Sequence, residues 1–435
     1  ARQLRTNGAS LHSLVGFHGF YSFLLVALPA FIFVLLWIMF QGTVIEGMVK
    51  NSLPSGTLDG LDSGAAQLVM TEIRSIAGGR VFGTPEPWKV EAADRLVSLR
   101  ATAGNMLVLI VALMTLLMLI VARRSVSADF RARQGVEQII RGLMIFCSVV
   151  AIFTTIGIIA SLLFETFRFF QLVPWNEFVF GTRWEPQMPI RADQIAATGA
   201  FGVVPVFLGT LVITVVALFV AVPVGLFSAI YLNEFAAPSV RAVAKPILEV
   251  LAGVPTVVYG FFAVLTVAPA LRVFGENWGL PIAPNTALAA GSVMGIMLVP
   301  FISSFADDAL SAVPRSLRDG SLALGATRGE TMRKVLFPAA IPGIVGGVLL
   351  AVSRAIGETM IVVMAAGLIA KMTINPLDSV TTVTVQIVTL LIGDSSFDSP
   401  KTLSAFALGL LLFLITLGIN VLALGIVRKY REIYD

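Results

Sequence analysis

An arginine and a glutamate interrupt a long apolar stretch of this chain, within the run SRAIGETM at Ser353–Met360. A charged side chain in the core of a bilayer costs roughly 2.5–3.5 kcal/mol on insertion scales, so it usually has a charge partner or a function. Arg354 and Glu358 are four residues apart, and on a continuous helix that spacing places both on one face, where they can pair. Gly357 would let a second helix approach closely, and Thr359 adds a hydroxyl group.

Two interpretations of this charge pair stay open. It can be a structural ion pair that faces a neighbouring helix, or Arg354, Glu358 and Thr359 can mark the path or gate of an anion. Arginine suits a tetrahedral oxyanion because its planar guanidinium group donates two hydrogen bonds at once. An arginine already bonded to a glutamate would have to be shared with the anion or released to it. The pair alone does not name the anion.

The sequence offers little for enzyme chemistry. It contains no Gly-Lys dipeptide, so the phosphate-binding loop of ATP-hydrolysing proteins is absent. It shows no Ser/His/Asp set, no metal-ligand spacing and no basic–aromatic stripe, and the single cysteine, Cys147, excludes an intramolecular disulfide. We therefore expect no catalytic residues, no bound metal or cofactor, and no nucleic-acid partner.

The composition requires a membrane. Hydrophobic residues make up 57% of the 435 residues and charged residues only 13%, with a mean hydropathy of +0.91. We predict an all-α polytopic membrane protein that lies in a lipid bilayer. The apolar stretches predict about eight transmembrane helices, at approximately residues 20–40, 105–122, 142–164, 201–229, 246–270, 286–305, 341–367 and 404–427.

Basic residues set the predicted orientation, because lysine and arginine mark the cytoplasmic side. With both termini inside, two cytoplasmic loops hold the basic clusters Arg123, Arg124, Arg131, Arg133 and Arg141, and Arg315, Arg318, Arg328, Arg333 and Lys334.

We expect two parts in the chain. Residues 1–141 form an amino-terminal extension with two spans and an outside loop at 41–104, and residues 142–435 form a domain with six spans. Within the outside loop, the composition of residues 64–102 is helical, broken by Gly and Pro at 78–88. The role of the extension stays open.

The cytoplasmic loop at residues 306–340 alternates apolar residues with Arg, Asp and Ser. Gly320 and Gly325 can break or turn a helix there, so the pattern predicts two short amphipathic helices along the membrane surface. Such helices either lie against lipid and solvent or dock a soluble partner.

This loop resembles the cytoplasmic loop of the membrane subunits of ATP-binding-cassette (ABC) importers, whose pattern is E-A-A-x3-G-x9-I-x-L-P. The spacing matches throughout, although five of the seven residues differ from the pattern. The matching positions are Asp319, Gly320 and Ser321 for E-A-A, then Gly325, Val335, Phe337 and Pro338. In that family the loop forms the coupling helices that insert into a groove on the ATPase subunit.

The run SRAIGETM is similar to the R-A-x-G-E-T signature of phosphate-specific transport permeases, and the following Met resembles the PstC-type subunit. Three further stretches also resemble that group: residues 173–186, 209–236 and 247–263. The resemblance covers about residues 142–435 and implies that the last six spans form a type I ABC importer permease core. It also implies that Arg354 and Glu358 act in phosphate passage.

The resemblance further implies a multi-pass subunit of the bacterial plasma (inner) membrane that forms the path of an ATP-driven phosphate importer. The implied partners are a PstA-type second permease, two PstB-type ATPase subunits that use ATP and Mg, and an extracytoplasmic phosphate-binding protein. The alternatives are a permease for another oxyanion such as sulfate or molybdate, a secondary carrier or channel, and a scaffold in phosphate sensing.

Overall fold

The computed structural model describes residues 12–54, 57, 63–80, 85–125, 127, 130–187, 199–392 and 398–430, and most of these are helical. Among them, eight helices are long and apolar enough to cross a membrane. Each overlaps one predicted span, which confirms the predicted all-α polytopic fold. They are Val15–Lys50, Pro87–Ser125, Ala132–Leu172, Val204–Phe235, Thr256–Asn277, Ala287–Ser311, Arg328–Ile356 and Pro400–Lys429.

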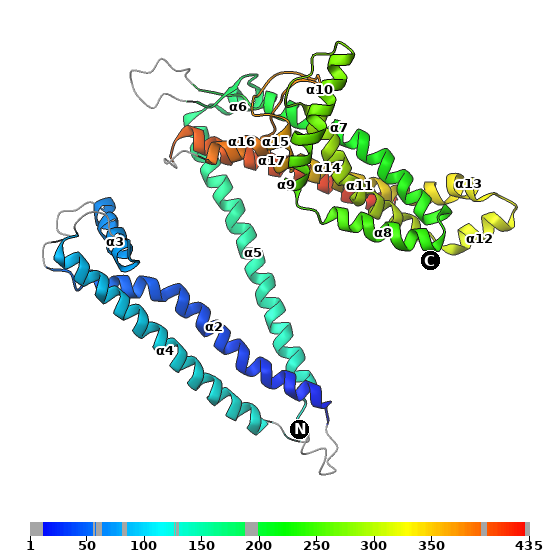
Figure 1. Cartoon of the computed structure of the whole chain (residues 1–435). Coiled ribbons are helices and arrows are strands. Elements are labelled where there is room, and N and C mark those ends of the chain that lie inside the picture. The colour runs from blue at the N-terminus through cyan, green and yellow to red at the C-terminus, as the bar shows by residue number, and fades with distance from the viewer. Residues whose placement is uncertain are drawn as a thin grey trace. The chain divides into compact units, whose positions relative to one another are not determined.

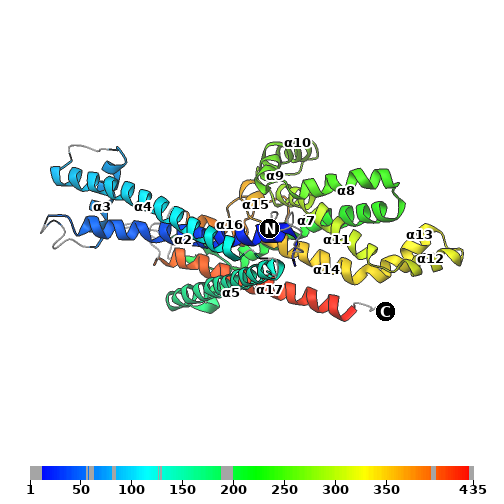
Figure 2. The ribbon, with the colours of Figure 1, turned by 90° about the horizontal axis from the view of Figure 1, so that it is seen from below.

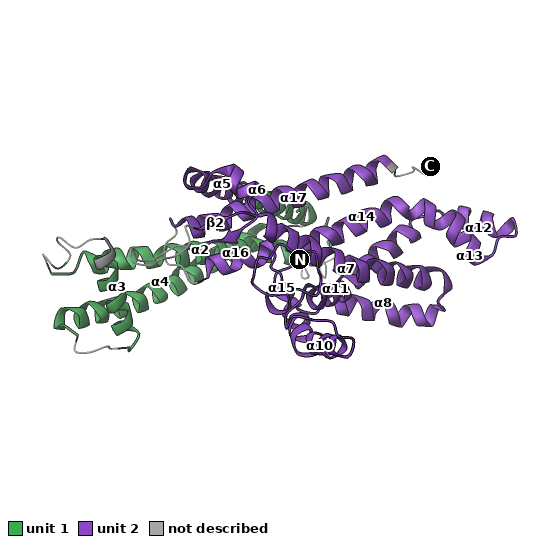
Figure 3. Cartoon of the chain, turned by 90° about the horizontal axis from the view of Figure 1, so that it is seen from above, with its two compact units in different colours: residues 1–154 green, residues 155–435 purple. Residues whose placement is uncertain are grey.

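By its internal contacts the chain divides into two compact units, residues 1–154 and 155–435 (Figure 3). Helix α5 (Ala132–Leu172) passes through this boundary.

The first unit is built on the paired helices α2 (Val15–Lys50) and α4 (Pro87–Ser125), with α3 (Ser63–Ala77) packed against α4. Its small core contains the buried residues Ile45, Val49, Met70, Ile73 and Leu96. The predicted break at 78–88 is confirmed, because α3 ends at Ala77 and α4 begins at Pro87. Gly79 adopts the left-handed backbone conformation after α3 (φ +78°), which a residue with a side chain rarely takes.

Helix α11 (Ala287–Ser311) is at the centre of the second unit, between α7 (Val204–Ile230) and α14 (Phe337–Ile356) (Figure 1). Small residues let α11 and α7 approach closely: a Cβ atom at Gly295 would lie 2.8 Å from the carbonyl oxygen of Ala217. The core around this contact is apolar and includes Ile213, Met294 and Leu298. This packing holds α7, α11 and α14 in place, and the charged residues described below lie on or next to these helices.

Two predicted spans are wrong as continuous helices. The segment 246–270 is divided between α8 (Pro238–Ala252) and α9 (Thr256–Phe262), because Pro255 disfavours helical geometry at the residue before it. After α9 the chain continues through a π-helical turn (Ala263–Val267) into α10 (Ala268–Asn277). The segment 341–367 is divided at Gly357 between α14 and α15 (Met360–Ala365).

Helices α12 (Arg315–Ala323) and α13 (Arg328–Thr331) lie at the end of the second unit where α7 turns into α8 (Figures 1 and 2). There an apolar cluster that includes Ala229, Leu310 and Leu336 joins α7, α11 and the segment before α14.

A separate, largely aromatic cluster joins α5 with the remaining elements of this unit. Its buried members include Phe169, Phe178, Trp184 and Phe201. The elements are α6 (Trp175–Phe180), the antiparallel strands β1 (Trp184–Glu185) and β2 (Ala200–Phe201), α16 (Val383–Leu391) and α17 (Pro400–Tyr430).

Candidate functional site

Arg354 is exposed in the last turn of α14. Its guanidinium carbon lies 4.1 Å from the centre of the Phe301 ring of α11. A cation over an aromatic ring at an exposed site is stabilised by about 0.5–1 kcal/mol, and the C-terminal end of a helix also favours positive charge. The ring and the helix end therefore hold the charge of Arg354 in place.

Arg354 and Glu358 do not form the structural ion pair that was one of the two open interpretations: the two side chains make no ion pair in the part of the chain that the structure describes. The four-residue spacing places two residues on one face only while the helix continues, and α14 ends at Ile356. The Glu358 carboxylate instead accepts a hydrogen bond of 3.1 Å from the backbone N–H of Met360, at the start of α15. Glu358 therefore acts on the backbone of α15, and no carboxylate of the described residues pairs with Arg354.

Thr359 also turns toward the backbone at this break. Its hydroxyl lies 3.4 Å from the carbonyl oxygen of Gly357, at the long limit of a hydrogen bond. The structure thus places Arg354, Glu358 and Thr359 around one interruption between two helices, with the arginine on one side and the two backbone contacts on the other.

A buried polar network, which sequence reasoning missed, supports the chain beyond this break. Thr384 of α16 donates a hydrogen bond of 2.8 Å to the carbonyl oxygen of Glu358. Gln386 donates to the carbonyl oxygen of Leu368 at 3.0 Å and accepts from the Trp184 indole at 2.9 Å. The signal was a row of polar residues in the apolar run VTTVTVQIV at 380–388. Because buried polar groups are costly without partners, this network fixes the backbone around Glu358.

A cavity of about 240 Å³ lies between α8 and α11. Its lining is mainly apolar but includes Lys245 and Glu249 of α8 and Asp307 of α11. Phe301 also lines the cavity, so the ring that contacts Arg354 is part of its wall. The cavity and the arginine are therefore connected through one aromatic side chain.

The predicted pair of short helices in the 306–340 loop is confirmed. Asp319, Gly320 and Ser321 lie within α12, and Gly325 makes the turn to α13 with φ +88°. Gly320 does not break a helix, which corrects the expectation for that residue. Val335 lies in the π-helical turn Met332–Leu336, and Phe337 and Pro338 begin α14.

Local hydrogen bonds stabilise the turn between α12 and α13. Thr327 and Glu330 form a capping box at the start of α13, in which the side chain of each accepts the backbone N–H of the other. The hydroxyl groups of Ser321 and Thr331 lie 3.0 Å apart and join the two helices. At the tip, Leu324 is 91% exposed. The turn between α12 and α13 thus presents an apolar side chain at its tip.

Comparisons with known proteins identify relatives among membrane transport proteins. A family model described as "Binding-protein-dependent transport system inner membrane component" matches residues 221–432, and one described as "Phosphate ATP-binding cassette transporter" matches residues 1–154. The probable ABC transporter permease protein YqgH of Bacillus subtilis is 32% identical over 281 residues, which cover 64% of this chain and 87% of that protein.

Two further relatives carry a more specific description. The phosphate transport system permease protein PstC 1 of Mycobacterium tuberculosis is 34% identical over 277 residues, covering 58% of this chain and 81% of the relative. PstC of Mesorhizobium japonicum is 33% identical over 245 residues, covering 52% of this chain and 73% of the relative.

A solved structure of the MetNI methionine ABC transporter, inward facing, matches 53% of this chain and 95% of that chain at 20% identity and a TM-score of 0.40.

The eight spans, the helical loop of α12 and α13 and the family matches define a membrane permease of the ABC transporter class. Within that class, the chain belongs to the family of PstC phosphate transport permeases.

Proposed function

We propose that this chain is one of two permease subunits of an ATP-driven phosphate importer in the bacterial plasma membrane, with both termini on the cytoplasmic side. A PstA-type permease would complete the path, two PstB-type ATPase subunits would hydrolyse ATP with Mg, and an extracytoplasmic protein would deliver phosphate. The relatives named for phosphate transport support this substrate.

The observation that carries the proposal is the state of Arg354. It is exposed at the end of α14, it is held by the Phe301 ring, and no carboxylate of the described chain neutralises it. A guanidinium in that state can donate two hydrogen bonds to a phosphate and offset its charge during passage. Glu358 has a different role from Arg354, because its carboxylate and its carbonyl oxygen both shape the backbone of the break.

Energy would enter through α12 and α13, which we assign as the docking element for the ATPase subunits. Closure of the ATPase dimer would displace α12 and rock the spans, and the path would open alternately to each side. Leu324 would lie in the contact because it is the most exposed apolar side chain of the loop.

The test is accumulation of labelled phosphate in cells that lack their own phosphate importers and receive the ATPase, the binding protein and the partner permease. We expect ATP-dependent accumulation only when this chain is added, and competition by unlabelled phosphate but not by sulfate. Competition by sulfate would assign a different oxyanion. Accumulation that needs no ATPase would assign a secondary carrier, and no accumulation with all subunits present would refute the transport role.

A further inference from the structure

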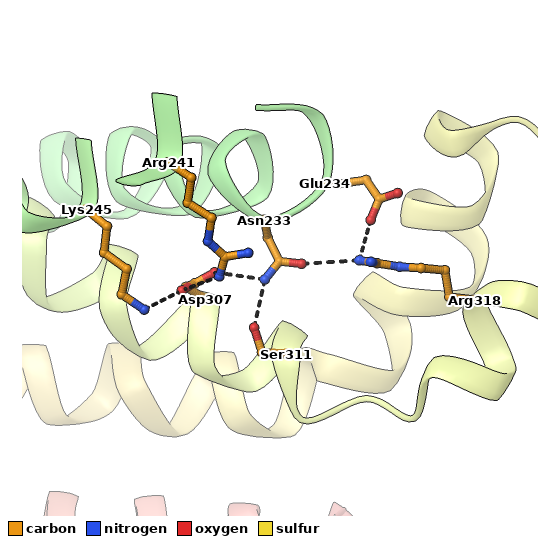
Figure 4. Close-up of polar contacts among 7 residues, drawn as sticks. All are labelled: Asn233, Glu234, Arg241, Lys245, Asp307, Ser311 and Arg318. Carbon is orange, nitrogen blue, oxygen red and sulfur yellow. Dashed lines mark hydrogen bonds and ion pairs between the residues drawn. The ribbon is translucent and has the colours of Figure 1, made fainter. Parts of the chain in front are cut away.

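A cluster of polar side chains joins four elements next to the α12–α13 loop (Figure 4). The elements are the π-helical turn Tyr231–Phe235 that ends α7, then α8, α11 and α12. The seven residues are Asn233, Glu234, Arg241, Lys245, Asp307, Ser311 and Arg318.

Asp307 is the centre of the cluster, with only 7% of its side chain exposed. Its carboxylate accepts hydrogen bonds from Arg241 at 2.9 and 3.0 Å, from Lys245 at 2.8 Å and from Asn233 at 2.8 Å. A buried carboxylate is tolerated only when its charge is paired and its lone pairs are bonded. Asp307 therefore fixes the position of α8 relative to α11, because both cations belong to α8.

Arg318 connects α12 to this centre. Leu317 of α12 packs against the apolar cluster around Leu310 and Leu336, but no side chain of α12 is fully buried, so polar contacts contribute to its position as well. Arg318 forms an ion pair with Glu234, whose side chain is 5% exposed, and donates to the Asn233 side-chain oxygen at 3.3 Å. The Asn233 amide nitrogen donates in turn to Asp307 at 2.8 Å and to Ser311 at 2.9 Å. Asn233 thus links the two halves of the cluster, with its oxygen toward the arginine and its nitrogen toward the carboxylate.

The far end of the cluster is at the cavity between α8 and α11. Lys245 and Asp307 line this cavity together with Phe301, the ring that contacts Arg354. A continuous set of polar contacts therefore leads from α12 to the wall of this cavity, which Phe301 also lines. Hydrogen bonds and ion pairs can move between discrete arrangements without repacking an apolar core, which suits an element that changes position in every cycle.

We propose that Arg318, Glu234, Asn233 and Asp307 form a coupling relay, which transmits the movement of α12 to α8 and to the cavity wall at Phe301. This proposal rests on the proposed function, since the movement of α12 comes from the ATPase. The four residues are positioning residues: they act through α8 and do not touch phosphate.

The decisive measurement is the number of ATP molecules hydrolysed per phosphate transported, in proteoliposomes that contain the complete transporter and its binding protein. Glu234→Gln breaks the link from the buried side, where the residue cannot contact the ATPase, and Arg318→Gln breaks it from α12. We expect both variants to bind the ATPase as the wild type does, while the ATP cost per phosphate rises about tenfold. Exchanging the charges, with Glu234→Arg and Arg318→Glu together, should recover part of the loss.

Arg272→Gln is the matched control, because Arg272 is an exposed arginine on α10, outside the cluster. An unchanged ATP cost in Glu234→Gln and Arg318→Gln would overturn the relay. Loss of ATPase binding in Arg318→Gln alone, with Glu234→Gln unaffected, would also overturn it and leave Arg318 as a docking residue. If the wild-type complex does not accumulate phosphate, the proposed function fails separately.

A second measurement tests the relay without transport. In lipid nanodiscs, amide hydrogen exchange of the complete chain should rise in α12 and also in α8 when Arg318 is replaced by glutamine, and should not change with Arg272→Gln. A rise confined to α12 would refute transmission to α8, even if the transported substrate is not phosphate.

Discussion

Replacing Arg354 by glutamine should lower phosphate uptake by about 10- to 100-fold while the transporter still assembles. The estimate follows from the geometry: no carboxylate of the described residues pairs with the guanidinium, so its charge is available to the anion. A hydrogen bond to a charged group contributes about 1.5–3 kcal/mol, and each 1.4 kcal/mol is a factor of about ten in an equilibrium constant. Arg354→Lys should be intermediate, because an ammonium group keeps the charge but cannot donate as a planar fork.

Phe301→Leu provides a graded test of the same reasoning. The ring contact at 4.1 Å contributes about 0.5–1 kcal/mol, so its loss should lower uptake only about two- to fivefold. Phe305→Leu is the matched control: Phe305 is on the same helix and lines the same cavity, but it lies next to Gly347 of α14 and no cation of the described residues lies over its ring.

The assay is ATP-dependent uptake of labelled phosphate at concentrations below saturation, normalised to the amount of ATPase that co-purifies with the permease. Wild-type uptake by Arg354→Gln would refute the role of the arginine in the path. Equal losses for Phe301→Leu and Phe305→Leu would show that the Phe301 ring matters for packing of α11 and not for Arg354.

Four further predictions concern the α12–α13 loop, the helix break and Asp378. Gly325→Ala should destabilise the α12–α13 turn by about 1–2 kcal/mol because of its left-handed backbone, and should weaken co-purification of the ATPase. Gly320→Ala, inside α12, should instead raise the thermal midpoint of the purified chain, and lowering it would contradict the helix. If Glu358 acts on α15, the losses from Glu358→Gln and Arg354→Gln should be additive in uptake within about 0.5 kcal/mol, and stronger coupling would indicate an ion pair. In the segment between α15 and α16, hydrogen bonds from the Thr373 hydroxyl and the Lys371 ammonium group hold the pKa of Asp378 below its ordinary value of 3.8. The ionised Asp378 carboxylate therefore stabilises the fold fully above pH 3.8, and this stabilisation is lost as pH falls through the lowered pKa. Asp378→Asn should lower the thermal midpoint of the purified chain at pH 7, and the difference from wild type should disappear in acid. A difference that does not change with pH would contradict this.

The sequence predicted the elements that depend on local chemistry. Long apolar runs located all eight spans, and the Gly and Pro residues at 78–88 located the end of α3 and the start of α4. Gly325 was identified as a turn residue for a physical reason that the structure confirms, its positive φ. Gly320 was not distinguishable from it by composition, because a glycine inside a helix costs only about 0.5–1 kcal/mol and is often tolerated.

The sequence could not reveal the polar cluster around Asp307. Asp307 is separated from Asn233 by 74 residues and from Lys245 by 62, and Arg318 is separated from Asn233 by 85. Each residue alone looks like an ordinary polar residue at the end of a span. Only the packing of α7, α8 and α11 brings them together, and packing of elements distant in sequence leaves no periodic signal in a single chain.

The break at Gly357 changes what the charges in SRAIGETM can do. On a continuous helix, Glu358 would neutralise Arg354, and an anion could bind only by displacing a carboxylate that is covalently fixed one turn away. Because α14 ends at Ile356, the carboxylate is used for the start of α15, and the guanidinium is held by an aromatic ring that does not cancel its charge. An arginine in that state can accept and release an anion without breaking an internal ion pair in each cycle. Phe301 lies both against the arginine and in the cavity wall, so a displacement of that wall would move the charge as well.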